Sequence, residues 1–346
     1  PPHLFSSAAS DVYKRQEPGF PTPEPVISTA VSELLDGKTK YTRGQGSPAL
    51  CEAVAHHLMK TSKISVSPEN VLITPGAKQA LLYSYMTVLN PSDEAILLSP
   101  SWASYEPMIS IIGGVPVNVP VDRKNFHPDM DAIRSSITDR TRMIMVNSPC
   151  NPTGAVYTRE EIEEIVSIAI EHDLWIISDE IYSRLIWNGG EHVSPATIEG
   201  GKERTIVISG WSKTWAMTGM RVGFLAGPEQ AVRAAVKCQA NSASHIPTFM
   251  MEAARVALDC DDHVERFSDA YRHRRNLIVQ GLEDIPGLRI VNPEGAFYLF
   301  IDVTGTGMSD VQFADGALKA GVQLIPASLI TGCLLYTSDA ADEKRC

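Results

Sequence analysis

Residues 205–214 read TIVISGWSKT, a run in which four β-branched residues lead directly into a polar turn that carries Lys213. Such a run is typical of a strand buried in a sheet. Residues 218–223 then read TGMRVG and place Arg221 before a second apolar run, which extends to residue 226. The stretch therefore predicts two strands with a lysine and an arginine in the connection between them.

Strand-like runs also occur upstream, and helix-like periods separate them. The apolar runs lie at residues 71–74, 94–98, 142–146 and 174–177, and a capping box from Thr158 to Glu161 opens a predicted helix. This alternation favours an α/β fold with a mostly parallel central sheet and helices on both faces. Two polar segments, NSPCNPTG at 147–154 and SDEIY at 178–182, follow strand ends, where open α/β sheets bind their ligands.

The pattern changes near residue 266. A long charged helix is predicted at 267–282, followed by a strand within residues 293–301 and a second capping box at 309–312. These elements indicate a smaller α/β unit after the central sheet.

The composition is that of an ordinary globular chain: 346 residues, of which 44% are hydrophobic and 21% charged. A formal net charge of −11 argues against nucleic acid or an anionic membrane surface as a partner. No apolar run approaches the roughly 18 residues that span a bilayer. The six cysteines form no C-x-x-C pair and no disulfide-like spacing, which favours the reducing cytoplasm.

The polar motifs together supply the groups that hold pyridoxal phosphate. They contain an amine for a Schiff base, a carboxylate for a pyridinium nitrogen, a phenol and an amide for a ring oxygen, and a guanidinium for a phosphate. With these motifs in this order, the chain resembles the fold-type I, pyridoxal-phosphate-dependent aminotransferases, and most of all their class I/II, aspartate-aminotransferase-like branch. The resemblance runs from about residue 17 to about residue 328.

The resemblance implies that Lys213 forms the Schiff base and moves the Cα proton. Partial burial beside Arg221 would lower the pKa of its amine. It also implies that Asp179 pairs with the pyridinium nitrogen, and that Tyr182 and Asn151 donate to the phenolic oxygen of the ring. The alternatives are a surface lysine, a helix N-cap aspartate and a simple Asn-Pro turn.

The implied phosphate site centres on Arg221, whose guanidinium binds bidentately. The segment Gly76, Ala77 and Lys78 opens a helix with bare amides, which suit a phosphate, although it also fits an ordinary helix start. Many family members have a phosphate-binding serine three positions before the lysine, where this chain has Gly210. We therefore expect Ser212 or Ser209 to supply this phosphate contact.

Two aromatic residues complete the implied site. Trp102 matches the ring that stacks on the cofactor, with a core tryptophan as the alternative. Tyr41 matches a tyrosine that reaches the phosphate of a neighbouring subunit, which implies a homodimer with shared active sites; the alternative is a loop tyrosine that packs locally. We predict no metal site, because neither His56-His57 nor His172-Asp173 has metal-ligand spacing.

The two ends show an unusual relation. One coding of residues 6–16, reverse-complemented and shifted by one frame, reads as residues 333–343. We therefore expect residues 1–16 and 333–346 to be translated sequencing adapter that flanks a truncated gene. The family's carboxylate-binding arginine would lie beyond residue 328 and has no counterpart here, and the family's glycine before Glu17 is replaced by Gln16.

The resemblance implies a division into residues 17–40 as the N-terminal part of a small domain, 41–265 as the large cofactor domain, and 266–332 as the remainder of a truncated small domain. The implied activity is a ping-pong transamination between an L-amino acid, with aspartate as first choice, and an oxo acid, with 2-oxoglutarate as first choice. The alternatives are another fold-type I activity, such as a β-lyase, or an inactive truncated fragment.

Overall fold

The computed structural model describes residues 17–187 and 189–328, so the proposed adapter-derived ends lie outside the described residues. A seven-stranded sheet with the order β1-β7-β6-β5-β4-β2-β3 forms its centre. Only β7 runs antiparallel to its neighbours, β1 and β6. The predicted α/β class and mostly parallel sheet are confirmed. The strands are β1 (Val71–Thr74), β2 (Glu94–Ser99), β3 (Val115–Pro120), β4 (Thr141–Asn147), β5 (Trp175–Asp179), β6 (Thr205–Gly210) and β7 (Gly223–Ala226).

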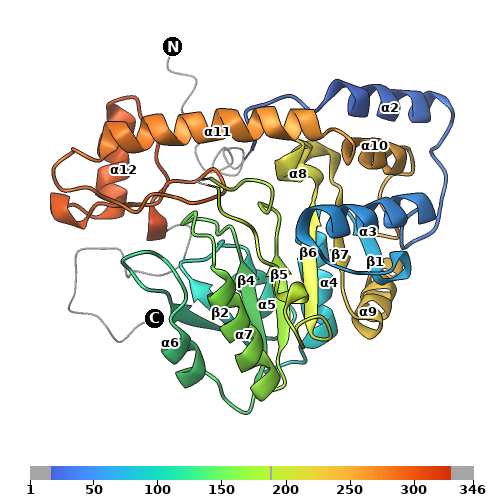
Figure 1. Ribbon diagram of the computed structural model, residues 1–346, viewed down its shortest axis with the longest axis horizontal. Helices are drawn as coiled ribbons and strands as arrows, with labels where there is room; N and C mark the ends of the chain where they lie inside the picture. The colour runs from blue at the N-terminus through green and yellow to red at the C-terminus, as the bar shows by residue number, and fades with distance from the viewer. Residues whose placement is uncertain (1–16, 188, 329–346) are drawn as a thin grey trace.

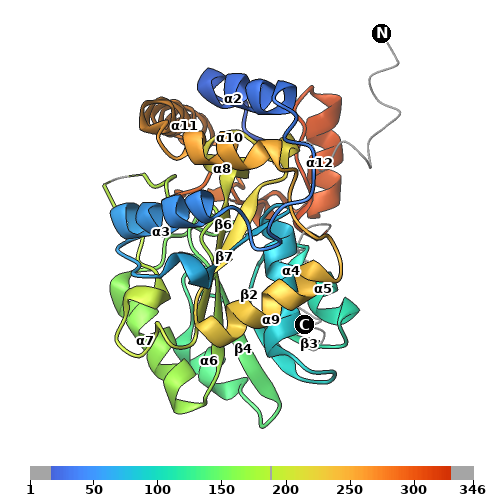
Figure 2. The same ribbon diagram turned by 90° about the vertical axis from the view of Figure 1, so that its right-hand side faces the viewer.

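Helices cover both faces of this sheet (Figures 1 and 2). One face packs against α4, α5 and α9, and the other packs against α3, α6, α7 and α10. The helices are α2 (Glu24–Leu35), α3 (Pro48–Ser62), α4 (Ala77–Val88), α5 (Tyr105–Ile111), α6 (Met130–Ser135), α7 (Arg159–Glu171), α8 (Trp211–Thr214), α9 (Glu229–Ala240), α10 (Phe249–Ala257), α11 (Asp261–Leu282) and α12 (Asp310–Lys319).

The two-residue period of the strands divides the core between the two faces. In β6, Ile206 and Ile208 join the cluster under α4 and α9, whereas Val207 joins the cluster under α3. All three side chains are at most 1% exposed. Because both faces are covered, the strands read as continuous apolar runs in the sequence.

β3 was not predicted. It pairs only with β2, at the edge of the sheet, and it contains Pro116 and Pro120. Proline lacks the N–H that a central strand needs, so these residues are tolerated at an edge and conceal the strand in the sequence.

The segment after the sheet carries α11 along one side of the molecule, with α12 near its far end (Figure 1). The predicted helix at 267–282 is confirmed and begins earlier, at Asp261. The two predicted capping boxes, at Thr158 and Ser309, are also present. No helix in the described ranges is long and apolar enough to cross a membrane.

The strand predicted within residues 293–301 is wrong for most of its length. The structure has a paired strand here only at Ile301–Asp302 (β9), which pairs with Arg289–Ile290 (β8), and a single antiparallel bridge joins Gly295 to Ile186. The amides of Glu294 and Gly295 both donate to the carbonyl of Gly154, so this backbone bonds to a loop instead of a strand. An apolar composition alone does not reveal such a partner.

Gly223 is where β7 passes closest to the turn before α4. A Cβ at this position would lie 2.3 Å from the amide nitrogen of Ala77 and 2.4 Å from the carbonyl carbon of Gly76. We predict that Gly223→Ala lowers the free energy of unfolding by about 1–3 kcal/mol, because backbone must move to admit the methyl group. Urea denaturation measures this change.

Gly316→Ala is the matched control, since a Cβ there meets nothing within 4 Å inside α12. We expect this variant to be neutral or slightly stabilising. Equal effects of the two substitutions would contradict the prediction.

Candidate active site

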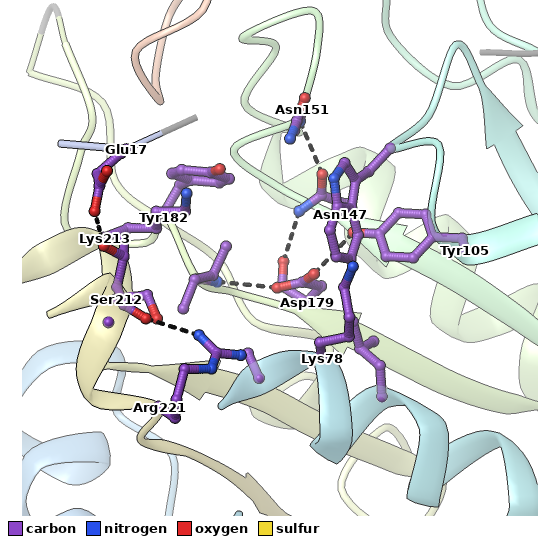
Figure 3. Close-up of a pocket in the computed structure, with 16 residues that line it drawn as sticks. Glu17, Lys78, Tyr105, Asn147, Asn151, Asp179, Tyr182, Ser212, Lys213 and Arg221 are labelled. Atoms are coloured by element: carbon purple, nitrogen blue, oxygen red, sulfur yellow. Dashed lines mark hydrogen bonds between the residues drawn. The ribbon is translucent and has the colours of Figure 1, made fainter. Parts of the chain in front are cut away.

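A pocket of 470 Å³ opens where the parallel strands end (Figure 3). This volume is within the usual range for small-molecule sites, about 300–1,000 Å³. Its wall is made by residues at the ends of β4, β5 and β6 and at the start of α4, as expected for an open α/β sheet. The lining includes nine of the residues predicted from the sequence: Ala77, Lys78, Trp102, Asn151, Asp179, Tyr182, Ser212, Lys213 and Arg221.

Lys213 lies in α8, the single helical turn that follows β6. Burial, with a smaller contribution from Arg221, lowers the pKa of its amine to about 8, against the opposing effect of Glu17 and Asp179. The ammonium nitrogen is 5.6 Å from the centre of the Phe297 ring. A lysine with this pKa is partly neutral near pH 8 and can act as a nucleophile or a base.

Asp179 ends β5 and is 4% exposed. Its Oδ2 accepts a hydrogen bond from the Tyr105 hydroxyl at 2.8 Å, and its Oδ1 accepts one from the Ile181 amide at 3.2 Å. Burial nevertheless raises the pKa of the carboxyl to about 6, because these bonds and Lys213 offset only part of the lost hydration. Hydrogen bonds therefore hold the Asp179 carboxylate in place, although burial destabilises its charged form.

Asn147 connects β4 and β5 at this edge. Its Nδ2 donates to the Asp179 carbonyl at 3.0 Å, and its Oδ1 accepts from the Asn151 amide at 2.8 Å. The Asn-Pro segment is thus fixed to the strand that carries the carboxylate. Asn151 is both a turn residue, as the alternative held, and part of the pocket wall.

Tyr182 closes the pocket beside Lys213. Its hydroxyl lies 2.5 Å from that of Tyr298, and its ring meets Phe297 edge-on at 5.5 Å. Burial, with Tyr298 as a further cause, raises the pKa of Tyr182 well above its usual value. The phenol therefore stays protonated and can donate a hydrogen bond.

The cationic end of the pocket is built around Arg221 and the N-terminus of α4. Gly76 has a φ of +86° and caps α4 without a side-chain hydrogen bond. A Cβ at Gly76 would lie 2.5 Å from Nη2 of Arg221, so only glycine lets the guanidinium approach the turn. Nη1 of Arg221 donates to the Thr218 carbonyl at 2.8 Å. Helix-start amides beside a guanidinium suit a phosphate.

Lys78 and Trp102 face each other across the pocket wall. The Lys78 ammonium is 4.8 Å from the centre of the Trp102 ring and donates to the Ser104 hydroxyl at 3.2 Å. Burial and Arg221 lower the pKa of Lys78. Trp102 is half-buried and meets Tyr105 edge-on; it lines the pocket and also packs against the core cluster under α4 and α9.

Tyr41 is not among the lining residues. It is 91% exposed, and its ring contacts only His245 among the aromatic pairs of the described chain, edge-on at 5.7 Å. Within one chain the structure does not bring it to the pocket.

Several lining residues had no predicted role. Tyr105 and Asn147 stand in the same segments as Trp102 and Asn151, so their position after strand ends was the available signal. Glu17 comes from the distant N-terminal segment and accepts a hydrogen bond from Thr218. No local pattern reveals a contact between residues so far apart in the chain.

Comparison with known proteins identifies the family. Residues 15–334 match the family model described as aminotransferase class I and II. The chain is 40% identical over 317 residues to the aspartate/prephenate aminotransferase of Thermus thermophilus, covering 90% of this chain and 81% of that protein. It is 41% identical over 299 residues to the aspartate aminotransferase of Musicola paradisiaca, covering 86% and 75% of the two chains.

Solved structures agree with this result. The aspartate aminotransferase of Thermus thermophilus with maleate superposes with a TM-score of 0.87 at 38% identity, over 93% of this chain and 87% of that one. An aromatic aminotransferase from Pyrococcus horikoshii gives a TM-score of 0.87 at 38% identity, over 90% and 85%. The fold is therefore that of the pyridoxal-phosphate-dependent transaminases. The chain belongs to the class I and II aminotransferases, as the resemblance implied.

The pocket fits pyridoxal phosphate, the cofactor of this family. It combines a lysine of lowered pKa, a buried carboxylate, a protonated phenol and a cationic helix start. The absence of a side chain at Gly76 leaves room for Arg221 beside the start of α4, an arrangement that suits an anion.

The raised pKa of Asp179 predicts a pH-dependent effect on the cofactor-free chain. A pKa raised from 3.8 to about 6 means that the associated stability is present below pH 4 and is lost as the pH rises through about 6. Asp179→Asn removes the buried charge, so we predict that it raises the free energy of unfolding by about 3 kcal/mol at pH 8 and leaves it unchanged at pH 4.

Asp173→Asn serves as the control, because that side chain is 99% exposed and asparagine also adopts its φ of +52°. Denaturant unfolding at the two pH values measures both variants. A gain at Asp179 that is equal at pH 4 and pH 8 would refute the electrostatic origin.

Proposed function

We propose that this aminotransferase exchanges the amino group of aspartate with 2-oxoglutarate in a ping-pong reaction. The names of its relatives support aspartate as the amino donor. The observation that carries the proposal is that Lys213, with a pKa of about 8, and the buried Asp179 line one pocket. This pair supplies a base and a fixed negative charge at the same site.

Pyridoxal phosphate, when bound, supplies an aldehyde that condenses with amines and a ring that accepts the electrons released when the Cα proton leaves. Lys213 would hold the cofactor through its amine and, once substrate displaces it, carry the Cα proton. Asp179 would keep the ring nitrogen protonated, since a buried carboxylate favours a cation beside it. Tyr105 helps by donating to Asp179 and so favouring its charged form.

The remaining residues bind and orient. Tyr182 and Asn151 would donate to the phenolic oxygen, and the pKa of Tyr182 keeps its proton available. Arg221, with Ser212 and the amides of residues 76–78, would hold the phosphate. Trp102 would stack on the ring, at a value of about 0.5–1.5 kcal/mol beyond the area it buries.

A spectrum tests the catalytic role. We predict that the chain with pyridoxal phosphate develops a yellow absorbance band that Lys213→Ala abolishes and that the surface variant Lys237→Ala retains. Lys237 is on α9, away from the pocket. The measurement is an absorbance scan before and after adding aspartate.

The response to aspartate separates the possible outcomes. Bleaching of the band to the pyridoxamine form supports transamination of aspartate. A band that is indifferent to aspartate and responds to an aromatic amino acid would replace the proposed substrate. No band in the parent chain would sink the proposed cofactor site.

We further propose that the enzyme works as a homodimer with shared sites. The support is an apolar groove of 540 Å³ between α2 and the start of α10 that extends to Arg221. Ile27, Val31 and Leu34 on this side of α2 are 43–52% exposed. Tyr41, 91% exposed, is free to reach the phosphate of a second copy. Burying such a surface against a second copy would remove its apolar area from water.

We predict that Val31→Glu yields a monomer with weakened cofactor binding, because the charge would be buried at the subunit contact. Ile278→Glu on α11 is the matched control, with 51% exposure against 52% for Val31. Sedimentation velocity measures the mass of each variant. A Val31→Glu chain that sediments like the parent dimer would place the contact elsewhere.

The proposed domain division also has structural support. Phe20 stacks on Phe267 at 4.4 Å and meets Tyr271 edge-on at 5.1 Å, which joins the N-terminal segment to α11. We propose on this basis that residues 17–40 and 266–332 form the small domain and residues 41–265 the large one.

The four described cysteines carry free thiols, which supports the proposed cytoplasmic location.

A further inference from the structure

His127 lies between two carboxylates in the connection from β3 to α6. Its Nδ1 is 2.9 Å from each carboxylate oxygen of Glu161, and its Nε2 is 3.3 Å from Oε2 of Glu294. The imidazole side chain is 13% exposed. With both ring nitrogens protonated, it donates to both partners at once.

The two carboxylates belong to different parts of the chain. Glu161 closes the capping box of α7, the helix that follows the Asn151 loop of the pocket. Glu294 comes from the irregular segment after α11, and its Oε2 also accepts from the Val156 amide at 3.0 Å. His127 therefore links the segment of residues 293–298 to the start of α7.

Segment 293–298 continues from this link to the pocket. The amides of Glu294 and Gly295 donate to Gly154 at 2.9 Å, and the Ala296 amide donates to Leu185 at 2.8 Å. The next residue, Phe297, is the ring that lies 5.6 Å from the Lys213 ammonium. The hydroxyl of Tyr298 then lies within hydrogen-bond distance of the Tyr182 hydroxyl, at 2.5 Å.

We propose that His127, as an imidazolium, is a positioning residue that fastens segment 293–298 to the start of α7 and thereby holds Phe297 and Tyr298 against the active site. It acts through Glu294 and touches neither substrate nor cofactor. The proposal rests on the proposed function in one respect: it takes Lys213 and Tyr182 to be active-site residues.

The charges around His127 make this fastening sensitive to pH. Glu161 and Glu294 raise the pKa of the imidazole to about 9, against the opposing effect of burial, and the Tyr157 ring lies 6.1 Å away. The same contact lowers the pKa of Glu294. Because the imidazole pKa is raised from 6.5, the stabilisation is complete below pH 6.5 and is lost as the pH rises through about 9.

Hydrogen–deuterium exchange of the full chain, equilibrated with pyridoxal phosphate, tests the proposal. We expect His127→Gln to speed exchange in residues 293–298 about tenfold at pH 7, the order expected for loss of one charge-assisted hydrogen bond. At pH 10, read at millisecond labelling times, the ratio of variant to parent should approach one, since the parent has lost the charge too. Exchange in α9 is the internal reference.

Further variants distinguish loss of the His127–Glu294 contact from a general loss of structure. Glu294→Gln should act in the same direction, and the double variant should add nothing, because both changes remove one interaction. His172→Gln is the matched control: its ring is 3.9 Å from Glu171 and 35% exposed. In the parent, protection of residues 293–298 should fall near pH 9 relative to α9, a measurement that needs no variant.

A ratio that is the same at pH 7 and pH 10, or no change at all in His127→Gln, would overturn the proposal. The cofactor absorbance of the same samples is read separately. A missing cofactor band would therefore count against the proposed function and would leave the exchange result standing.

Discussion

The active site depends on burying an amine and a carboxylate at the ends of neighbouring strands. Desolvation is the largest influence on both groups: it brings the pKa of Lys213 down to about 8 and that of Asp179 up to about 6. Each charge favours the other, but this attraction is smaller than the loss of hydration. The sheet supplies the apolar packing that makes such burial possible, and the site uses the altered pKa values.

This burial explains why the surrounding loops are so fully hydrogen-bonded. Asn147 bonds to the strand end of Asp179 and to the Asn151 amide, and Tyr105 bonds to the carboxylate itself. A buried charge left without such partners would destabilise the fold by several kcal/mol. These hydrogen bonds therefore fix the loops at the strand ends where the charge is buried, and so they orient the side chains that line the pocket.

Much of the sheet and of the pocket was predictable because both follow from local patterns. Covered strands read as apolar runs, and the lysine, aspartate and Asn-Pro motifs stand directly after them. The edge strand β3 escaped because its prolines disguise it. Glu17 escaped because it reaches the pocket only through the return of the N-terminal segment to Thr218, a contact that no spacing encodes.

Segment 293–300 shows the limit of periodicity most clearly. Its apolar residues suggested a strand, yet its amides bond to Gly154 and Leu185 and its carbonyl at Glu294 accepts from Trp187. Gly154 allows this close approach because it has no side chain. A Cβ there would lie 2.4 Å from the Cβ of Pro293, and its φ of +76° also favours glycine. The segment is thus shaped by the loop that it covers. A sequence records which side chains are apolar, whereas the partner of each amide is set only when distant segments meet. That is why side chains whose role depends on this meeting, such as Phe297 beside Lys213, emerge from the fold and not from a motif.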